Sequence, residues 1–183
     1  MEKLIAKLKQ TIALQLFTIF LRYLLGSAFV YASVFKILGI RFTPKSGENA
    51  PIDSLPHFLE AMYQSGYYWY FIGWGQLVVG FLLMSQILST LGAVAFFPIM
   101  LNIVMITTSF DSISVFIITC LMLLANIYLL LWDWNKLKFI VLLEPKNYYD
   151  DNAELSKRKV WVYLALLLFL IIVFYRLHAG AYL

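Results

Sequence analysis

Residues 112–134 read SISVFIITCLMLLANIYLLLWDW, a run with no charged residue before Asp133. An α-helix rises about 1.5 Å per residue, so about 20 residues cross the ~30 Å hydrocarbon core of a bilayer. A strand of a membrane β-barrel would alternate apolar and polar residues, and this run does not alternate. The stretch therefore predicts a transmembrane helix.

The same pattern recurs in further apolar runs at residues 11–40, 67–88, 91–110 and 160–177. Of the 183 residues, 62% are hydrophobic and 13% are charged, which is more apolar surface than a soluble domain of this length can bury. In lipid the backbone must satisfy its own hydrogen bonds, and helices do so. We therefore predict an all-α integral membrane protein. It consists of a four-helix transmembrane bundle and a fifth, peripheral C-terminal transmembrane helix, because the last run is apolar on every face.

The lysines and arginines outside the apolar runs predict the orientation. Most of them lie before residue 11 or in the polar stretch 135–159. Because basic loops stay in the cytoplasm, we expect five crossings of the cell inner membrane, with the N-terminus inside and the C-terminus outside. The predicted domains are a bundle at 1–134 with its outer loop at 41–66, a cytoplasmic loop at 135–159, and an additional helix with a short outer tail at 160–183.

Composition and the placement of histidine and cysteine exclude several classes of protein. The net charge is +4, but the basic residues flank apolar runs and form no stripe, so the expected partner is the lipid bilayer and not a nucleic acid. Cys120 is the only cysteine, which excludes a dithiol within the chain. His57 and His178 lie in the outer loop and the outer tail, so histidines cannot hold a haem between the spans. We predict no metal site and no cofactor bound covalently or by histidine.

Arg22 is the most costly residue in the first apolar run. An arginine at a helix centre costs about 2.5–3.5 kcal/mol on insertion scales, against about 0.3–0.6 kcal/mol gained per Leu, Ile, Phe or Val. It is therefore expected to seek the bundle interior, a carboxylate or an aqueous pocket. Helical spacing puts Gln15 and Lys36 on the same face as Arg22, so we expect this face to point inward. Two alternatives stay open: Arg22 clamps backbone carbonyls, and Lys36 extends to the nearby outer interface.

Polar residues in the other runs are candidates for the same interior. Gln76 lies in the second run on a face whose glycines suit close helix packing, and Asn102 follows Pro98 by four residues in the third. Asn126 belongs to a line of polar residues on one face of the fourth run, for which interhelical hydrogen bonding is the default role. Together these residues are candidates to line one polar pocket. The predicted ligand-binding residues are Arg22, Lys36, Gln76, Asn102 and Asn126, and no catalytic residue is predicted.

Two stretches resemble the DoxX family of small bacterial membrane proteins. Residues 22–36, RYLLGSAFVYASVFK, are similar to the family's opening helix, with an Arg, a Gly four residues on and a downstream Lys. Residues 72–83, IGWGQLVVGFLL, are similar to its second-helix stretch. The resemblance covers residues 11–134. Two residues depart from the family pattern: Ser33 stands where Gly is usual, and Gln76 stands where Glu is common.

Members of this family are linked to respiratory or sulfur-compound oxidation, and one branch resembles the membrane subunit of a thiosulfate:quinone oxidoreductase. The resemblance therefore implies an accessory or quinone-contacting subunit of a redox-linked membrane complex, with a protein partner. It implies that Arg22 and Lys36 hold an anionic group or a quinone head, with Gln76 and Asn102 as further donors. Two other functions stay open, a non-catalytic scaffold or assembly factor and a small organic-anion transporter. The sequence also leaves open whether the chain is an enzyme.

Overall fold

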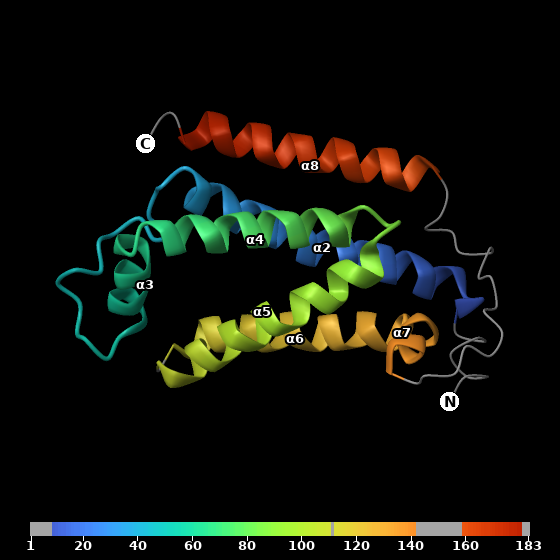
Figure 1. Ribbon diagram of the computed structural model, residues 1–183, viewed down its shortest axis with the longest axis horizontal. Coiled ribbons are helices and arrows are strands. Elements are labelled where there is room, and N and C mark those ends of the chain that lie inside the picture. Colours follow the sequence, from blue (N-terminus) through green and yellow to red (C-terminus); the bar gives the residue numbers. More distant parts are fainter. Residues whose placement is uncertain (1–8, 111, 142–158, 181–183) are drawn as a thin grey trace.

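The computed structural model describes residues 9–110, 112–141 and 159–180. Within these ranges the regular structure is entirely helical, as predicted (Figure 1). The helices are α2 (Ile12–Ile37), α3 (Leu55–Gln64), α4 (Tyr67–Met84), α5 (Ser89–Ser109), α6 (Ile113–Trp132), α7 (Trp134–Val141) and α8 (Lys159–Gly180). Helix α7 occupies the start of the segment that we predicted as a cytoplasmic loop. Most of the rest of that loop, and the end of the predicted outer tail, lie outside the described residues.

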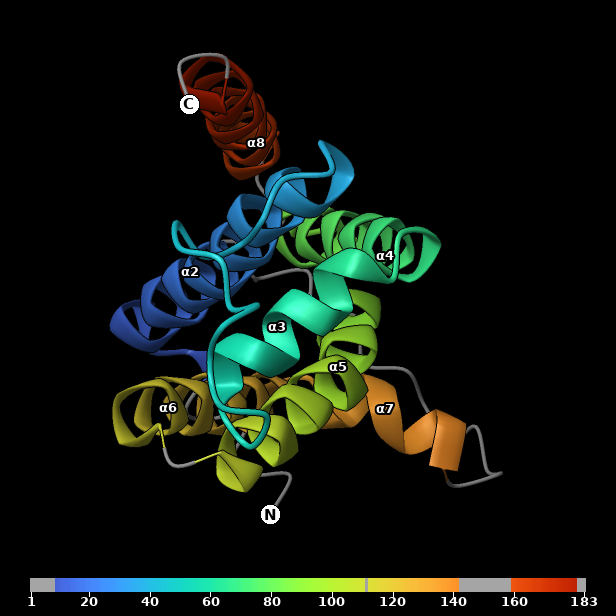
Figure 2. The same cartoon turned by 90° about the vertical axis from the view of Figure 1, so that its left-hand side faces the viewer.

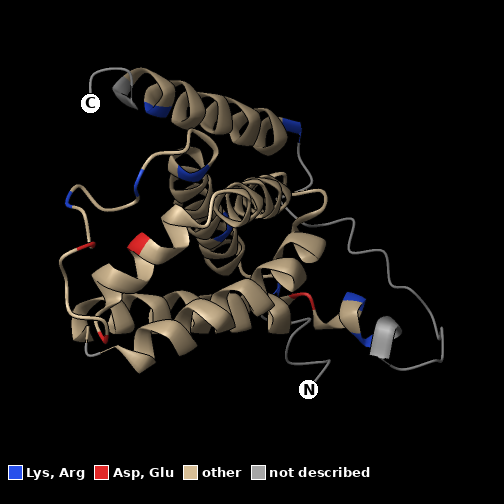
Figure 3. Ribbon diagram, turned by 60° about the vertical axis from the view of Figure 1, so that its left-hand side comes forward, with Lys and Arg blue, Asp and Glu red and all other residues tan. Residues whose placement is uncertain are grey.

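Four of these helices, α2, α5, α6 and α8, are long and apolar enough to span a membrane. Helix α4, which we predicted as another span, is not among them, so the prediction of five crossings is not confirmed. The first half of α4 is rich in tyrosine and tryptophan, and the helix also carries three glycines and Gln76, all of which lower its mean hydropathy. Figure 3 shows that Lys, Arg, Asp and Glu are sparse along the long helices and lie mostly near their ends and in the loops.

The bundle consists of two helix pairs, α2 with α4 and α5 with α6. Glycines let α2 and α4 approach closely, since a Cβ atom at Gly80 would lie 2.8 Å from the carbonyl oxygen of Gly26. This is the packing role that the sequence predicted for the glycines of this helix. Helix α8 lies against α2 at the edge of the bundle, where Tyr23 Oη donates a 2.8 Å hydrogen bond to the carbonyl oxygen of Trp161 (Figure 2).

The two pairs are joined at one end and apart at the other. Where α4 turns into α5, the two helices are so close that a Cβ atom at Gly92 would lie 2.7 Å from Cα of Leu83. From there α5 runs obliquely away from α4, and α3 lies across the gap at the far end (Figures 1 and 2). Phe29 and Phe96 stack between the pairs with ring centroids 4.0 Å apart. We call the end with the α4–α5 turn the closed end and the end with α3 the open end.

Candidate functional site

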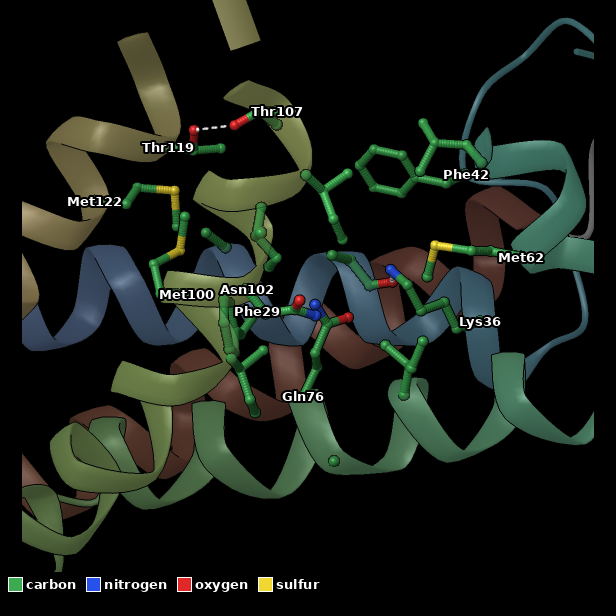
Figure 4. Close-up of a pocket in the computed structure, with 18 of the residues that line it drawn as sticks. Phe29, Lys36, Phe42, Met62, Gln76, Met100, Asn102, Thr107, Thr119 and Met122 are labelled. Carbon is green, nitrogen blue, oxygen red and sulfur yellow. Dashed lines mark hydrogen bonds between the residues drawn. The ribbon is translucent and has the colours of Figure 1, made fainter. Parts of the chain in front are cut away.

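A cavity of about 1170 Å³ lies between the two helix pairs, toward the open end. Residues of α2, α4, α5 and α6 line its sides, and residues of α3 and of the loop before it line its end. The cavity exceeds the roughly 300–1,000 Å³ that ligand pockets occupy. Its lining is mostly apolar. The aromatic and methionine residues labelled in Figure 4 are Phe29, Phe42, Met62, Met100 and Met122.

Lys36 points its ammonium group into this cavity. The residue is 7% exposed, and Nζ donates a 3.1 Å hydrogen bond to the carbonyl oxygen of Ala32. Nζ also lies over the rings of Phe42 and Trp69, 4.8 and 5.0 Å from their centroids. Ring faces attract cations, but in the described part of the chain no carboxylate forms an ion pair with Lys36. The ammonium is therefore buried without a counter-ion from the described residues, and it faces the cavity rather than the outer surface.

Gln76 and Asn102 bring two amide groups to the same cavity. Gln76 is 5% exposed, and its Oε1 is buried without a hydrogen-bond partner. The side chain of Asn102 also makes no hydrogen bond within the described residues, so it does not compensate for the interruption of α5 at Pro98. Figure 4 shows the polar ends of Lys36, Gln76 and Asn102 directed toward the same part of the cavity. The structure thus brings together three of the five predicted residues.

Arg22 lies elsewhere, at the closed end. It is 1% exposed, and its Nη2 forms a 3.1 Å ion pair with Oδ2 of Asp133. Its Nη1 donates a 3.1 Å hydrogen bond to Oε1 of Gln86, and Thr90 Oγ1 donates one of 2.9 Å to the same carboxylate oxygen. Arg22 therefore pairs with a carboxylate, which was one of its expected partners. It does not line the cavity with Lys36. The four residues tie together α2, the α4–α5 turn, the start of α5 and the end of α6.

Asn126 also lies outside the cavity lining. Its Nδ2 donates a 3.0 Å hydrogen bond to the carbonyl oxygen of Ala93, which joins α6 to α5. Interhelical bonding, the default expectation for this polar line, accounts for its position. Farther along the same face, Thr119 shares a 3.0 Å hydrogen bond with Thr107, and both of these threonines do line the cavity (Figure 4).

Helix α3 and the loop from residue 41 to residue 54, which we call the roof, cover the open end. Arg41 Nε donates hydrogen bonds of 3.0 and 2.9 Å to the two carboxylate oxygens of Glu60, and the backbone nitrogen of Gly47 donates one of 3.2 Å. The bond from Arg41 lowers the pKa of Glu60 below its usual value and raises the pKa of Arg41. The roof residues of α3 that line the cavity are Leu55, Phe58, Leu59 and Met62.

The sequence patterns missed part of this arrangement. Asp133 is not among the predicted site residues, but it is 1% exposed, and Arg22 and Thr90 form hydrogen bonds with its carboxylate. Its place on the same face as Asn126, seven residues earlier, was the available signal for an inward direction. Phe42 gave no signal, since no periodic pattern marks a loop residue that folds back over a bundle.

Comparison of the chain with protein-family models, with curated proteins and with solved structures found no match. The resemblance to the DoxX family therefore stays a prediction. The described residues also contain no group of three or more His, Cys, Asp or Glu side chains that could hold a metal ion. Within those residues, the side chains with polar groups that line the cavity are Lys36, Gln76, Asn102, Thr107, Thr119, Ser27, Tyr31, Tyr68 and Trp69.

Proposed function

We propose that this chain is a DoxX-like protein of the cell inner membrane that binds a quinone in its cavity, as an accessory or quinone-contacting subunit of a redox-linked complex. One observation carries the proposal: a buried ammonium without a counter-ion, that of Lys36, faces an apolar cavity beside the unpartnered Oε1 of Gln76. A quinone is a flat apolar ring with two carbonyl oxygens. The ring would pack among aromatic side chains, while Lys36 and the amide nitrogens would donate to the carbonyls.

In this proposal a protein partner supplies the electrons, and the chain holds the quinone. The reduced form, a quinol, has hydroxyl groups that could donate to Oε1 of Gln76, so the site offers partners to both redox states. The basic N-terminal segment and the basic stretch 135–159 support an orientation with the N-terminus inside and the C-terminus outside. Helix α4 would cross the membrane as well, because it connects α2 and α5, two helices that are long and apolar enough to span it.

The test is a titration of the purified protein in lipid nanodiscs with a decyl-substituted benzoquinone. The variant Lys36→Met removes the ammonium and keeps an apolar side chain of similar length. A hydrogen bond from a charged group is worth about 1.5–3 kcal/mol, so we expect the variant to bind about 10- to 100-fold more weakly. Lys45→Met, in an exposed part of the roof, is the matched control and should bind like the wild type. No binding by the wild type, or equal binding by Lys36→Met, would refute the proposal.

The scaffold function has support from a different region. The Arg22–Asp133 pair and the bond from Asn126 to Ala93 fix how the helices meet, which is what an assembly factor requires. The organic-anion transporter has less support, because Arg22 is engaged with Asp133 and only Lys36 is left to hold an anion in the cavity. If the scaffold function is correct, conservative replacement of Arg22 lowers the yield of folded protein and no quinone binds.

A further inference from the structure

The cavity reaches the side of the bundle between α4 and α5, and it also reaches the opposite side, where Leu24 and Tyr31 of α2 and Val115 of α6 line it and are exposed. Phe71 lines the cavity and is also 72% exposed, and Tyr68, on the same helix, combines the same two properties. Across the gap on α5, Pro98 and Asn102 also line the cavity and are exposed. Because the two helices touch at the closed end and diverge from it, the gap widens toward the roof. We call this opening, bounded by Tyr68, Phe71 and Gly75 of α4 and by Pro98 and Asn102 of α5, the side window.

Gly75 shows that the side window is open. A Cβ atom built on Gly75 meets no atom within 4 Å. Two other glycines of α4 behave differently: a Cβ atom at Gly73 would lie 2.7 Å from Cβ of Lys36, and one at Gly80 would lie 2.8 Å from the carbonyl oxygen of Gly26. Those two glycines serve helix packing. Gly75 instead leaves free space at a position that lines the cavity.

The surroundings of the side window are apolar. Helix α5 is long and apolar enough to span a membrane, so the flank of the bundle at Pro98 faces hydrocarbon and not water. The α4 edge presents Tyr68 and Phe71, and Ile72 and Ile106 lie deeper on the two sides. A molecule that passes through this opening therefore comes from the bilayer, and its part inside the opening must be apolar.

We propose that the ligand is a chain-bearing quinone whose ring lies at Lys36, Gln76 and Asn102 and whose hydrocarbon chain leaves the bundle through the side window. This inference rests on the proposed function and specifies the class of ligand. It explains why the polar groups gather at one place in a cavity larger than a quinone ring needs.

Three substitutions test the route. Gly75→Phe is designed to fill the side window from a position where a Cβ atom meets no atom within 4 Å. Val78→Phe places the same ring on the exposed surface of α4 at a residue that does not line the cavity. Ala28→Phe narrows the opposite side of the cavity, where residues of α2 and α6 line it. Each variant is titrated in nanodiscs with a decyl-substituted benzoquinone and with the same benzoquinone without its decyl chain.

We expect Gly75→Phe to weaken binding of the decyl compound at least tenfold and binding of the chainless compound less than threefold. Val78→Phe should bind the decyl compound like the wild type, whereas Ala28→Phe narrows the cavity itself and should weaken binding of the decyl and chainless compounds by the same factor. Equal binding of the decyl compound by wild type and Gly75→Phe would overturn the inference while the proposed function stands. A loss caused by Ala28→Phe that is confined to the decyl compound would also overturn it, since the chain would then leave between α2 and α6.

A second measurement does not depend on the quinone. A phospholipid with a diazirine at the end of one acyl chain is photolysed in proteoliposomes, and the labelled residues are found by mass spectrometry. An open side window lets the chain end reach Met100 and Ile103, which line the cavity, in the wild type and in Val78→Phe but not in Gly75→Phe. Labelling of these residues without quinone binding would refute the proposed function and keep the side window. Absence of labelling in the wild type would overturn the side window itself.

Discussion

The closed end and the open end each bury a cation of the same helix. Arg22 and Lys36 are 1% and 7% exposed, and they lie four turns apart on α2, about 21 Å at a rise of about 1.5 Å per residue. Arg22 is neutralised by Asp133, whereas the partners of Lys36 among the described residues are two ring faces and one backbone carbonyl. The two residues share a helix face and a charge, so their partners decide their roles. The paired cation fixes where the helix pairs join, and the other faces the cavity in which we propose that a ligand binds.

The largest expected effect comes from breaking the closed end. Asp133→Asn keeps the size of the side chain but leaves the buried guanidinium of Arg22 uncompensated. Removing one partner of a buried ion pair costs about 3–5 kcal/mol, so we expect the free energy of unfolding to fall by about that amount. Unfolding in nanodiscs or mild detergent, followed by far-UV circular dichroism, measures it. Lys136→Met is the control, because Lys136 lies 3.5 Å from the same carboxylate but is partly exposed, and its loss should cost less than about 1 kcal/mol.

A double variant sharpens this result. Apolar side chains of similar volume often replace a buried ion pair without loss of stability. We therefore expect Arg22→Met with Asp133→Leu to recover most of the stability that Asp133→Asn loses. If Asp133→Asn unfolds like the wild type, the ion pair does not hold the closed end together.

The second prediction compares two glycines of α4. A Cβ atom at Gly80 would lie 2.8 Å from the carbonyl oxygen of Gly26 and 3.0 Å from Cγ2 of Val30, so Gly80→Ala must push α2 and α4 apart. Overpacking of this kind costs about 1–3 kcal/mol. Gly75→Ala has free space and gains helix propensity, so it should be neutral or stabilise the protein by up to about 1 kcal/mol. Thermal unfolding of the two variants measures the difference in their stability. Equal melting temperatures would contradict the conclusion that Gly80 lies in a packed helix contact and Gly75 in the open side window.

Sequence patterns located the polar groups but not their partners. Helical spacing placed Arg22 and Lys36 on one inward face, because the faces of a single helix follow from its period. The period does not say which helices meet. The contact between Arg22 and Asp133, which are 111 residues apart in the sequence, could therefore not be predicted. The sequence also could not predict that α5 diverges from α4. Because of this divergence, the cavity lies toward the open end, away from Arg22 and Asn126. Local composition is enough to predict that a helix forms. Whether side chains of different helices line one pocket depends on the angles at which those helices cross.

The third prediction compares two buried amides, Gln76 of the cavity and Asn126 of the packed interior. Oε1 of Gln76 has no partner, so Gln76→Leu removes an unsatisfied carbonyl and should raise the free energy of unfolding by about 1 kcal/mol. The same change removes a ligand contact, and we expect decyl benzoquinone to bind about 3- to 10-fold more weakly. Asn126→Leu also removes a buried carbonyl without a partner, Oδ1, but it breaks the hydrogen bond from Nδ2 to Ala93 as well, so we expect a net loss of stability of up to about 1 kcal/mol without a change in quinone affinity. Unfolding and quinone titration of both variants distinguish an amide that binds the ligand from one that holds two helices together. A loss of stability in Gln76→Leu would contradict the proposed role of Gln76 in the cavity.

The smallest effect concerns the roof at acidic pH. The hydrogen bond from Arg41, with that from Gly47, lowers the pKa of Glu60, while burial of the carboxyl group opposes this shift. A lowered folded-state pKa means that the bond stabilises the roof at pH above the unfolded value of about 4.3, and that this stabilisation is lost as the pH falls through the folded-state pKa. We therefore expect backbone amides of α3 to exchange faster at pH 3 than at pH 6, after correction for the intrinsic rate, while those of α6 keep their protection.

Glu60→Gln provides the control for this pH dependence. The variant cannot ionise, so its α3 amides should exchange faster than those of the wild type at pH 6 and should show no further change at pH 3. Because residues of α3 line the end of the cavity and not the side window, a loosened roof should leave entry from the bilayer intact. Quinone affinity should accordingly change less than threefold between wild type and Glu60→Gln at pH 6. A larger loss of affinity would mean that the roof, and not only the two helix pairs, holds the bound ring.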